Sequence, residues 1–359
     1  MPADPVAAAL ERPEGLLRLT ASDWNLLLRR ARRAGLLGRL ALRAGTFEDA
    51  LPDRVRDQLA AARAEAAQHA RVIRWEVDRI RHALRPTGVP WVLIKGAAYV
   101  LAELPPAAGR LVTDVDVLVP REGLAAVERA LTEHGWETLT LDPYDQRYYR
   151  TWMHELPPLC HGDRGTVVDV HHNILPTTGR LHPDPRKLLA AARPLDGSGL
   201  RVLAPEDLVL HGAAHLFQGG DLEGGLRDLC DLDALLRHFG EREPGFWPRL
   251  VPRARELDLR RPLYYALRFC RRLLDAPIPG DVLAAAEGGR PPAAVGRLMD
   301  ALAARALDAE RGHGRLAALA ELLLDVRAHW LRMPPRLLVP HLSRKAWRRW
   351  GVGEAAPVR

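Results

Sequence analysis

Two aspartates stand in a run of valines in the stretch GRLVTDVDVLVP (109–120). Alternate residues of a β-strand project to the same face, so Asp114 and Asp116 would lie side by side with Leu118, while the valines between them face the core. Two adjacent carboxylates repel each other unless a cation lies between them. The spacing therefore predicts a site for a hard divalent cation, and Mg²⁺ is the usual choice where phosphates supply further ligands.

A third aspartate lies in a second strand-like run, TVVDVHH (166–172). In such a strand Asp169 shares a face with Val167 and His171. If this strand pairs beside the first, Asp169 joins the same patch, and three carboxylates from two strands can hold two metal ions about 4 Å apart. That arrangement stabilises both the attacking and the leaving oxygen in phosphoryl or nucleotidyl transfer.

The sequence IKGAA (94–98) predicts a strand-to-helix turn with a glycine at the bend. Gly96 would let the backbone approach a ligand closely, and the N–H groups that open the helix would form an anion site. Lys95 adds a positive charge suited to phosphate. Arg110, upstream of the two aspartates, is a candidate clamp on a phosphate or on the substrate. Both cations fit an alternative interpretation as solvated surface residues.

Between residues 86 and 203 the chain alternates between short strand and helix patterns, as in a small α/β or α+β domain. The predicted strands are a short β-branched run within PTGVPWVLIKG (86–96), after a turn signal and before the glycine, and then DVDVLV (114–119), WETLTL (136–141) and GTVVDVHHN (165–173). The predicted helices are AAYVLAEL (97–104) and REGLAAVERALTEHG (121–135). A long loop is predicted between the last two strands.

Helical patterns flank this core on both sides. LTASDWNLLLRRARRAGLLGRLALRAG (19–45), with Ser22 or Asp23 as its cap, is followed by a long helix from about Pro52 to Leu84. Further along, PEDLVLHGAAHLF (205–217) and LRDLCDLDALLRHFG (226–240) are separated by a glycine-rich loop. We therefore expect three regions: an N-terminal helical region (1–85), a core (86–203) and a C-terminal helical region with a basic tail (204–359).

The composition is that of a soluble globular protein, with 47% hydrophobic residues and a net charge of +7. A mild positive charge is compatible with phosphate-bearing partners but does not select nucleic acid. No uninterrupted apolar run reaches transmembrane length, and no secretory apolar segment opens the chain. The three widely spaced cysteines are expected to be reduced thiols, so we expect a cytoplasmic location.

Taken in order, these motifs resemble the polymerase-β-like nucleotidyltransferase superfamily. In that superfamily a strand, a glycine turn and a helix precede D-x-D on one strand and a third Asp on a later strand. More narrowly, IKGAA…GRLVTDVDVLVP…GWE…VVDVHHNI…APEDLVLHGAAHLF…LRDLCDLDALL is similar to a little-characterised bacterial nucleotidyltransferase family with the pattern LKG–R–DxDLLV–DLHW. The resemblance covers about residues 88–240.

The resemblance implies a small mixed-sheet core of the α+β class, Mg²⁺ or Mn²⁺ as the metal, and an NTP such as ATP as co-substrate. It implies that Asp114 and Asp116 are metal ligands and that Asp169 is the third carboxylate. Classical members follow the glycine with a serine that holds a phosphate, whereas Ala97 follows Gly96 in this chain.

Three functions stay open at this point. The first is transfer of an NMP from an NTP to an acceptor with release of pyrophosphate, in which Asp169 is also the candidate base for the acceptor proton. The second is phosphotransfer at the same metal site, and the third is nucleotide or RNA binding without catalysis. The missing serine favours the third, whereas the retained carboxylates favour an enzyme. The acceptor (small molecule, peptide, protein or RNA), the preferred base and the oligomeric state are not specified.

Several residues are candidates for the substrate side of the site. His171 and His172 could be metal ligands, but a zinc site needs three or four ligands with closer support, so His171 is predicted to hydrogen-bond at the site wall. His211 and His215 are four residues apart on one helix face, which favours packing against the core over contact with the substrate. Asp228 is a candidate for the domain interface or the acceptor side.

Two charged features have ordinary structural interpretations. Arg227 and Asp231 stand at i and i+4, which predicts a simple helix ion pair. The tail SRKAWRRWG (343–351) mixes basic residues with tryptophan, a composition that fits nucleic acid, a membrane surface or a docked C-terminal helix equally well.

Overall fold

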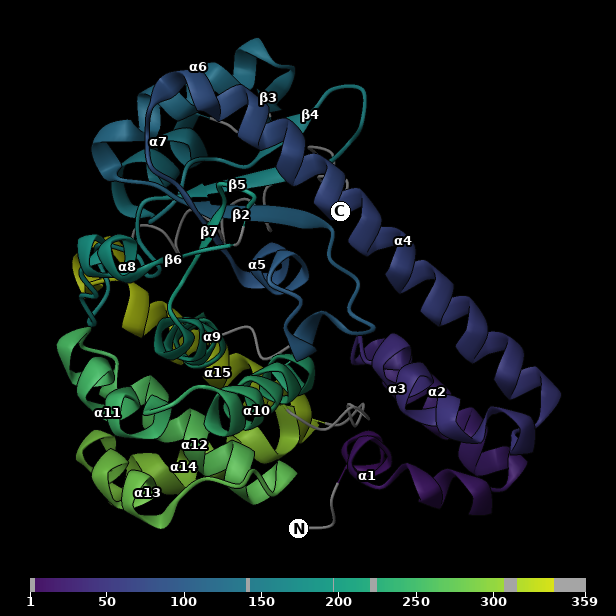
Figure 1. The fold of residues 1–359 in the computed structure, drawn as a ribbon. Coiled ribbons are helices and arrows are strands. Elements are labelled where there is room, and N and C mark those ends of the chain that lie inside the picture. Colours follow the sequence, from purple (N-terminus) through teal and green to yellow (C-terminus); the bar gives the residue numbers. More distant parts are fainter. Residues whose placement is uncertain (1–3, 140–142, 196, 220–224, 307–314, 339–359) are drawn as a thin grey trace.

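The computed structural model describes residues 4–139, 143–195, 197–219, 225–306 and 315–338. The chain opens with helices, as predicted, and the longest of them, α4, runs from α2 and α3 to the sheet (Figure 1). The bounds of these helices are α1 (Pro5–Glu11), α2 (Ala21–Arg33), α3 (Leu37–Ala44) and α4 (Asp53–Leu84).

A seven-stranded sheet follows, with the strand order β3-β4-β5-β2-β1-β7-β6. β2 runs parallel to β5 and β1 runs parallel to β7, whereas the other neighbouring pairs are antiparallel. This mixed sheet with flanking helices is the α+β architecture that the sequence predicts. The strands are β1 (Val92–Ile94), β2 (Asp114–Leu118), β3 (Trp136–Thr138), β4 (Leu159–His161), β5 (Val167–His171), β6 (Arg193–Pro194) and β7 (Arg201–Val202).

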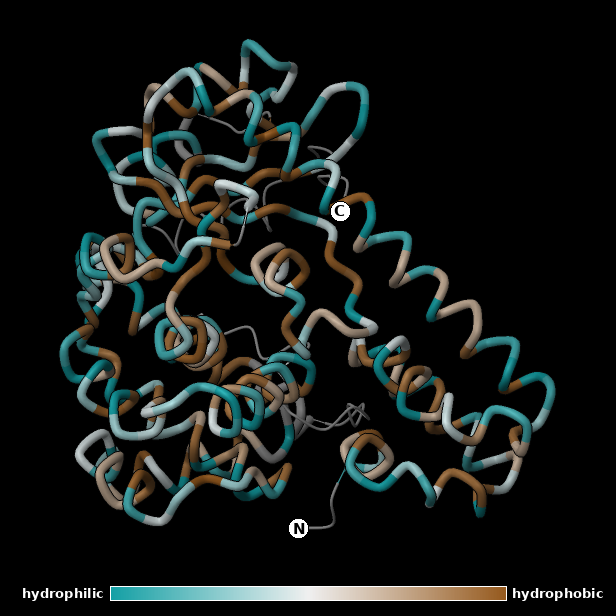
Figure 2. Tube along the Cα trace, in the orientation of Figure 1, coloured by the Kyte–Doolittle hydropathy of each residue, from teal (hydrophilic) through white to brown (hydrophobic). Residues whose placement is uncertain are grey.

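The central strands β1, β2 and β5 carry much of the core and include hydrophobic segments of the trace (Figure 2). Val115 and Val117 of β2 are buried, as the alternation predicts. Leu118 is also fully buried, although the alternation places it on the face of the aspartates. The polar part of that face is therefore confined to the start and middle of β2.

Two elements occupy the segment that the sequence interpretation treats as a long loop. They are α7 (Pro143–Trp152) and the short strand β4. The sequence of α7, PYDQRYYRTW, contains no aliphatic residue, so the usual 3.6-residue hydrophobic pattern is missing. The strand predicted over 136–141 is β3, which ends at Thr138, and residues 140–142 lie outside the described part of the chain.

The remaining helices pack around the sheet or follow it as a helical assembly (Figure 1). Those around the sheet are α5 (Lys95–Leu101), α6 (Leu124–Glu133) and α8 (Pro185–Ala191). Those after it are α9 (Pro205–Gly219), α10 (Gly225–Arg242), α11 (Phe246–Glu256), α12 (Arg260–Leu274), α13 (Gly280–Ala286), α14 (Ala293–Ala306) and α15 (Arg315–Arg332). Short 3-10 turns span Pro13–Arg18, Gly45–Ala50, Arg85–Thr87, Pro105–Ala107, Arg121–Gly123 and Glu287–Gly289. None of the helices in the described residues combines the length and the apolar character that a membrane span requires.

The start of α2 differs from the prediction by two or three residues. Thr20 is the cap: its Oγ1 accepts the backbone N–H of Asp23 at 3.2 Å, and the Asp23 carboxylate accepts the N–H of Thr20 at 3.0 Å. This reciprocal pair is a capping box. The predicted caps Ser22 and Asp23 are therefore wrong, because Asp23 is the third residue of the first turn.

A buried ion pair joins α4 to the sheet. Glu76, whose side chain is 1% exposed, accepts Nε of Arg164 at 2.6 Å and Nη2 at 3.1 Å. Arg164 comes from the turn between β4 and β5, and its guanidinium lies 4.8 Å from the ring centre of Trp136. Apolar residues of α4 at helical spacing are buried beside it: Ile73, Val77 and Ile80.

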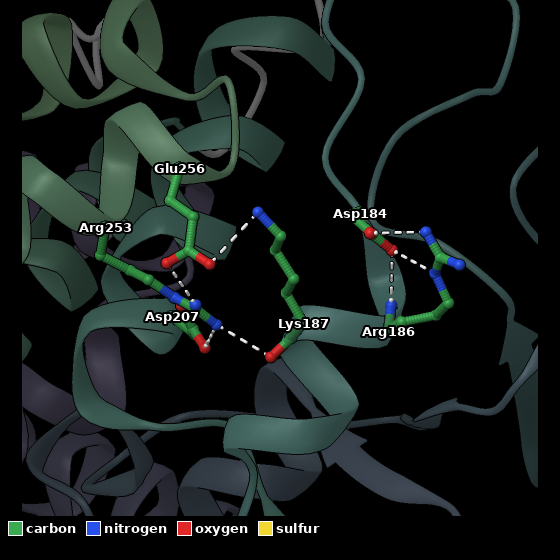
Figure 3. A network of polar contacts seen from close by, with 6 residues as sticks. All are labelled: Asp184, Arg186, Lys187, Asp207, Arg253 and Glu256. Carbon is green, nitrogen blue, oxygen red and sulfur yellow. Dashed lines mark hydrogen bonds and ion pairs between the residues drawn. The ribbon is translucent and has the colours of Figure 1, made fainter.

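A second polar network joins α8 to α9 and α11 (Figure 3). Asp207 of α9 is fully buried and accepts Nε and Nη2 of Arg253 at 2.7 and 2.8 Å. Arg253 also donates to the backbone carbonyl of Lys187 at 2.9 Å and to Glu256 at 2.8 Å. Lys187 in turn lies 3.3 Å from Glu256, so one arginine connects three helices.

Candidate functional site

Three aspartates meet on the neighbouring strands β2 and β5. Asp114 and Asp116 belong to β2, and the parallel register places Asp116 directly opposite Asp169 of β5. One carboxylate oxygen from each residue lies within 4.8 Å of the other two. The strand pairing that the sequence interpretation assumed is therefore present, and it produces a cluster of three carboxylates.

Asp116 is the most deeply buried member of the cluster, with a side chain that is 2% exposed. Its Oδ1 accepts Nζ of Lys95 at 2.6 Å and Nε2 of His171 at 2.9 Å. Burial disfavours the charged carboxylate, but Lys95 and His171 outweigh it and lower the pKa of Asp116 below its usual range. Asp116 is thus ionised at neutral pH and holds the Lys95 ammonium beside it.

Asp169 and Asp114 are shifted in the opposite direction. Burial, followed by the charge of Asp116, raises the pKa of Asp169 to about 7 and also raises the pKa of Asp114. Oδ1 of Asp169 is buried and has no hydrogen-bond partner among the described residues. A divalent cation would satisfy this oxygen and relieve the repulsion, so the donor set fits Mg²⁺ or Mn²⁺.

Mg²⁺ is expected to stabilise the protein more at about pH 8 than at about pH 5. The folded pKa of Asp169 lies above its unfolded value, so the folded state binds more protons. The stability of the metal-free protein therefore falls as the pH rises from about 4 to about 7. The cation binds the ionised carboxylates and therefore recovers stability mainly above that window. Melting temperatures with and without Mg²⁺ at both pH values measure the effect, with Asp169→Asn as the control that should lose it. Equal stabilisation at both pH values would contradict the expectation.

The turn into α5 has an unusual backbone. Lys95, its first residue, has a φ of +51°, a left-handed conformation that residues with side chains rarely adopt. Gly96 is buried, and an added Cβ would lie 2.8 Å from Cγ1 of Val112. Packing against Val112 therefore requires the glycine, a reason that the sequence interpretation did not give. Ala97 is fully buried, and the phosphate contacts of Gly96 and Ala97 stay predictions.

Gly96→Ala is expected to destabilise the protein by about 1–3 kcal/mol, the usual cost of overpacking a core. The added methyl would meet both γ-carbons of Val112, at 2.8 and 3.2 Å. Chemical denaturation measures the free energy of unfolding. In a Val112→Ala background the same change should be neutral or stabilising, because the clash is gone and alanine favours helix. An equal loss in both backgrounds would contradict the packing argument.

Arg110 lies in the loop before β2 and connects it to α10. Its guanidinium contacts the carboxylate of Asp231, lies 3.9 Å from Asp228 and stacks 5.8 Å from the ring centre of Tyr99. Asp231 also accepts a hydrogen bond from Arg39 of α3. Arg110 thus ties the loop to α10 and α5, and its contact with a phosphate stays a prediction.

The predicted ion pair between Arg227 and Asp231 is wrong. Arg227 binds its neighbour Asp228 instead, with Nη2 2.8 Å from Oδ1. The side chain of Asp231 is 5% exposed and forms ion pairs with Arg39 of α3 and Arg110 of the loop before β2. Tertiary contacts have replaced the local pair, which is worth only about 0.2–0.5 kcal/mol on an isolated helix.

The histidines predicted near the site differ in burial. His171 is 1% exposed and bonds Asp116, which confirms a hydrogen bond at the site wall. His211 is buried, whereas the side chain of His215 is 53% exposed with Nδ1 3.7 Å from Asp228. A cavity of about 40 Å³, space for one or two waters, lies between these groups and is lined by Lys95, Tyr99, Arg110, His211, His215 and Asp228, among others. The substrate contacts of His171, His215 and Asp228 stay predictions.

Two further residues beside the site were missed in the sequence interpretation. Glu155 stands opposite His171 in an isolated antiparallel bridge, and Nδ1 of His171 lies 3.1 Å from its Oε2. The ring of His154 lies 5.3 Å from that of His171. The available signal was the adjacent His-Glu pair in MHEL (153–156), but it falls in a segment without strand alternation. The basic tail over 343–351 lies outside the described residues.

A mixed sheet that presents three carboxylates from two parallel strands, next to a glycine turn, has the arrangement expected for polymerase-β-like nucleotidyltransferases. The chain belongs to the family described as uncharacterised nucleotidyltransferase, whose model matches residues 20–275. The match includes all the candidate site residues. In the sequence it extends from α2 to α12, so it also includes helices that precede and follow the strands. No curated protein matches the chain.

Proposed function

We propose that the protein is a Mg²⁺-dependent nucleotidyltransferase, which transfers an NMP from an NTP to an acceptor and releases pyrophosphate. The observation that carries the proposal is the register of β2 and β5, which sets Asp116 opposite Asp169 with Asp114 in the same cluster. Membership of a nucleotidyltransferase family supports the same reaction class. Asp114, Asp116 and Asp169 would hold the metal, which when bound supplies charge stabilisation to the phosphate oxygens.

Asp169 is the proposed base for the acceptor proton. Its Oδ1 has no hydrogen-bond partner among the described residues, and coordination by the metal would keep the carboxylate ionised and near the acceptor. Asp116 differs, because its Oδ1 is already occupied by Lys95 and His171. The two carboxylates therefore have separate roles: Asp116 as a permanently ionised ligand and Asp169 as the group whose proton occupancy changes.

The phosphate side of the site is proposed to include Lys95 and Arg110, with Gly96 and Ala97 in the turn beneath it. Lys95 stands between the carboxylates and the small cavity, so its charge is available to both. His215 and Asp228 are proposed for the acceptor side, and His171 for the same side through its hydrogen bond to Asp116. The acceptor itself is a hydroxyl, phosphate or similar group on a small molecule, peptide, protein or RNA.

Two labelled nucleotides distinguish this function from its alternatives. The protein is incubated with Mg²⁺, a cell extract as the source of acceptors, and NTP labelled at either the α- or the γ-phosphate. Nucleotidyl transfer moves the α-label to an acceptor and releases the γ-label as pyrophosphate. Transfer of the γ-label would indicate a phosphotransferase instead. Metal-dependent nucleotide binding with no transfer of either label would indicate a binding protein and would overturn the proposed activity.

A further inference from the structure

A second group of potential metal-ligand side chains contacts Asp116 through His171. It consists of His154, Glu155 and His171, each of which offers one ligand atom within 4.8 Å of the other two. Oε2 of Glu155 lies 3.1 Å from Nδ1 of His171 and 3.8 Å from Nε2 of His154. We propose that these three side chains bind a first-row transition-metal ion of the Zn²⁺ type, at a site separate from the three aspartates.

The backbone already holds these ligands in position. Glu155 and His171 face each other in an antiparallel bridge, so their side chains project from directly opposite positions. The N–H of Leu156 donates to the carbonyl of Val170 at 2.8 Å, and the N–H of His172 donates to that of His154 at 2.7 Å. Because hydrogen bonds fix the segment on both sides of the bridge, little backbone ordering would be needed on metal binding.

One ring nitrogen of each histidine in this group is buried without a hydrogen-bond partner among the described residues. The His171 side chain is 1% exposed, and its Nδ1 is buried without a hydrogen-bond partner among the described residues, even though it is aimed at Glu155. Nδ1 of His154 is likewise buried without a hydrogen-bond partner in that part of the chain, and its Nε2 lies 3.8 Å from Oε2 of Glu155. An unpaired buried polar group costs about 1–3 kcal/mol. A metal ion bound to Nδ1 of His171 would remove that cost for the more deeply buried of the two rings.

The other nitrogen of His171 supports the same assignment. Its Nε2 lies 2.9 Å from Asp116, the arrangement in which the ring donates an N–H to a carboxylate. Histidines that bind metals almost always donate their second N–H in this way, which fixes the tautomer and leaves the opposite nitrogen free to ligate. The hydrogen bond to Asp116 therefore assigns Nδ1 of His171 as the metal ligand.

The donor set selects the class of metal. Two imidazoles and one carboxylate suit Zn²⁺ and its neighbours, whereas Mg²⁺ prefers oxygen ligands alone. Three protein ligands leave a fourth position for water, as in zinc sites with two histidines and one glutamate. Since His171 contacts both the proposed ion and Asp116, the ion would fix the orientation of Asp116. This inference does not depend on nucleotidyl transfer.

Titration with Co²⁺, a coloured substitute for Zn²⁺, tests the site in the full-length protein after removal of metals with a chelator. We expect the native protein to bind Co²⁺ with visible absorption that Zn²⁺ abolishes and Mg²⁺ does not. His154→Asn and Glu155→Gln nearly preserve the shape of the side chain. Each should weaken Co²⁺ binding by at least about 10–100-fold, which is the loss measured when an outer-shell partner of a metal ligand is removed. Asp169→Asn, the matched control at the aspartate cluster, should bind Co²⁺ like the native protein.

Three outcomes would overturn the proposal. They are no visible absorption with the native protein, unchanged affinity in folded His154→Asn or Glu155→Gln protein, and loss of the absorption in Asp169→Asn, which would assign the ion to the aspartates. Circular dichroism establishes that each variant is folded, and either of the two ligand variants is sufficient for the comparison. No nucleotide is present in the titration, so absence of nucleotidyl transfer would not change its result.

Discussion

Asp116→Asn is expected to lower the rate of nucleotidyl transfer by about 10³-fold while the protein stays folded. The charge stabilisation supplied by a bound metal is worth several kcal/mol, and each 1.36 kcal/mol of barrier is a factor of about ten in rate. Asparagine keeps the shape of the side chain, and its amide oxygen can still accept from Lys95. The rate at which the α-phosphate label reaches the acceptor measures the effect.

A control for this substitution is present in the turn between β4 and β5. Asp163 is an exposed aspartate outside the cluster, so Asp163→Asn makes the same chemical change without touching the site. We expect this variant to keep the native rate. A native rate in folded Asp116→Asn protein would rule out Asp116 as a metal ligand required for the reaction. Equal losses in both variants would point to a general effect of charge.

Arg253→Ala is expected to lower the free energy of unfolding by about 3–5 kcal/mol, the cost of leaving a buried charge without its partner. Asp207 is fully buried, and two of its hydrogen bonds come from Arg253 (Figure 3). Burial already raises the pKa of Asp207 despite the arginine, so the remaining carboxylate would be protonated or would draw in water. Chemical denaturation measures the loss.

Two matched variants test the physical reason for that loss. Arg186→Ala removes the arginine of the neighbouring pair with Asp184, whose arginine side chain is 88% exposed, and should cost about 0–1 kcal/mol. Asp207→Asn in the Arg253→Ala background removes the unpaired charge and should recover part of the stability. A loss of the same size for both arginines, or no recovery in the double variant, would contradict the role assigned to burial.

The strands that hold the aspartates could be predicted because their signal is local. Alternation with valine identifies DVDVL and VVDVH as strands and places the carboxylates on them. The pairing of these strands brings the carboxylates together, but the register that sets Asp116 opposite Asp169 is a property of the folded sheet. The fold class could be predicted because each strand and helix has a local pattern and because the motifs occur in a fixed order along the chain.

Contacts between segments far apart in the chain could not be predicted in this way. Nothing near Gly96 indicates that Val112 packs against it, and nothing near Asp231 indicates Arg39 and Arg110 as its partners. Glu155 was missed because its alignment with His171 depends on a single bridge in a segment without alternation. In each case a tertiary contact decides the role of the residue, and the local sequence carries no record of it.

Mn²⁺ binding tests most directly whether the three aspartates form a divalent-cation site. Electron paramagnetic resonance measures this binding with NTP present. Competition by Mg²⁺ separates this oxygen-lined site from one with imidazole ligands. We expect the native protein to bind Mn²⁺ in competition with Mg²⁺, and Asp114→Asn, Asp116→Asn and Asp169→Asn each to weaken binding at least about tenfold, a loss of about 1.4 kcal/mol. Asp163→Asn should bind like the native protein. Unchanged Mn²⁺ binding in all three cluster variants would contradict the assignment of the metal to these carboxylates.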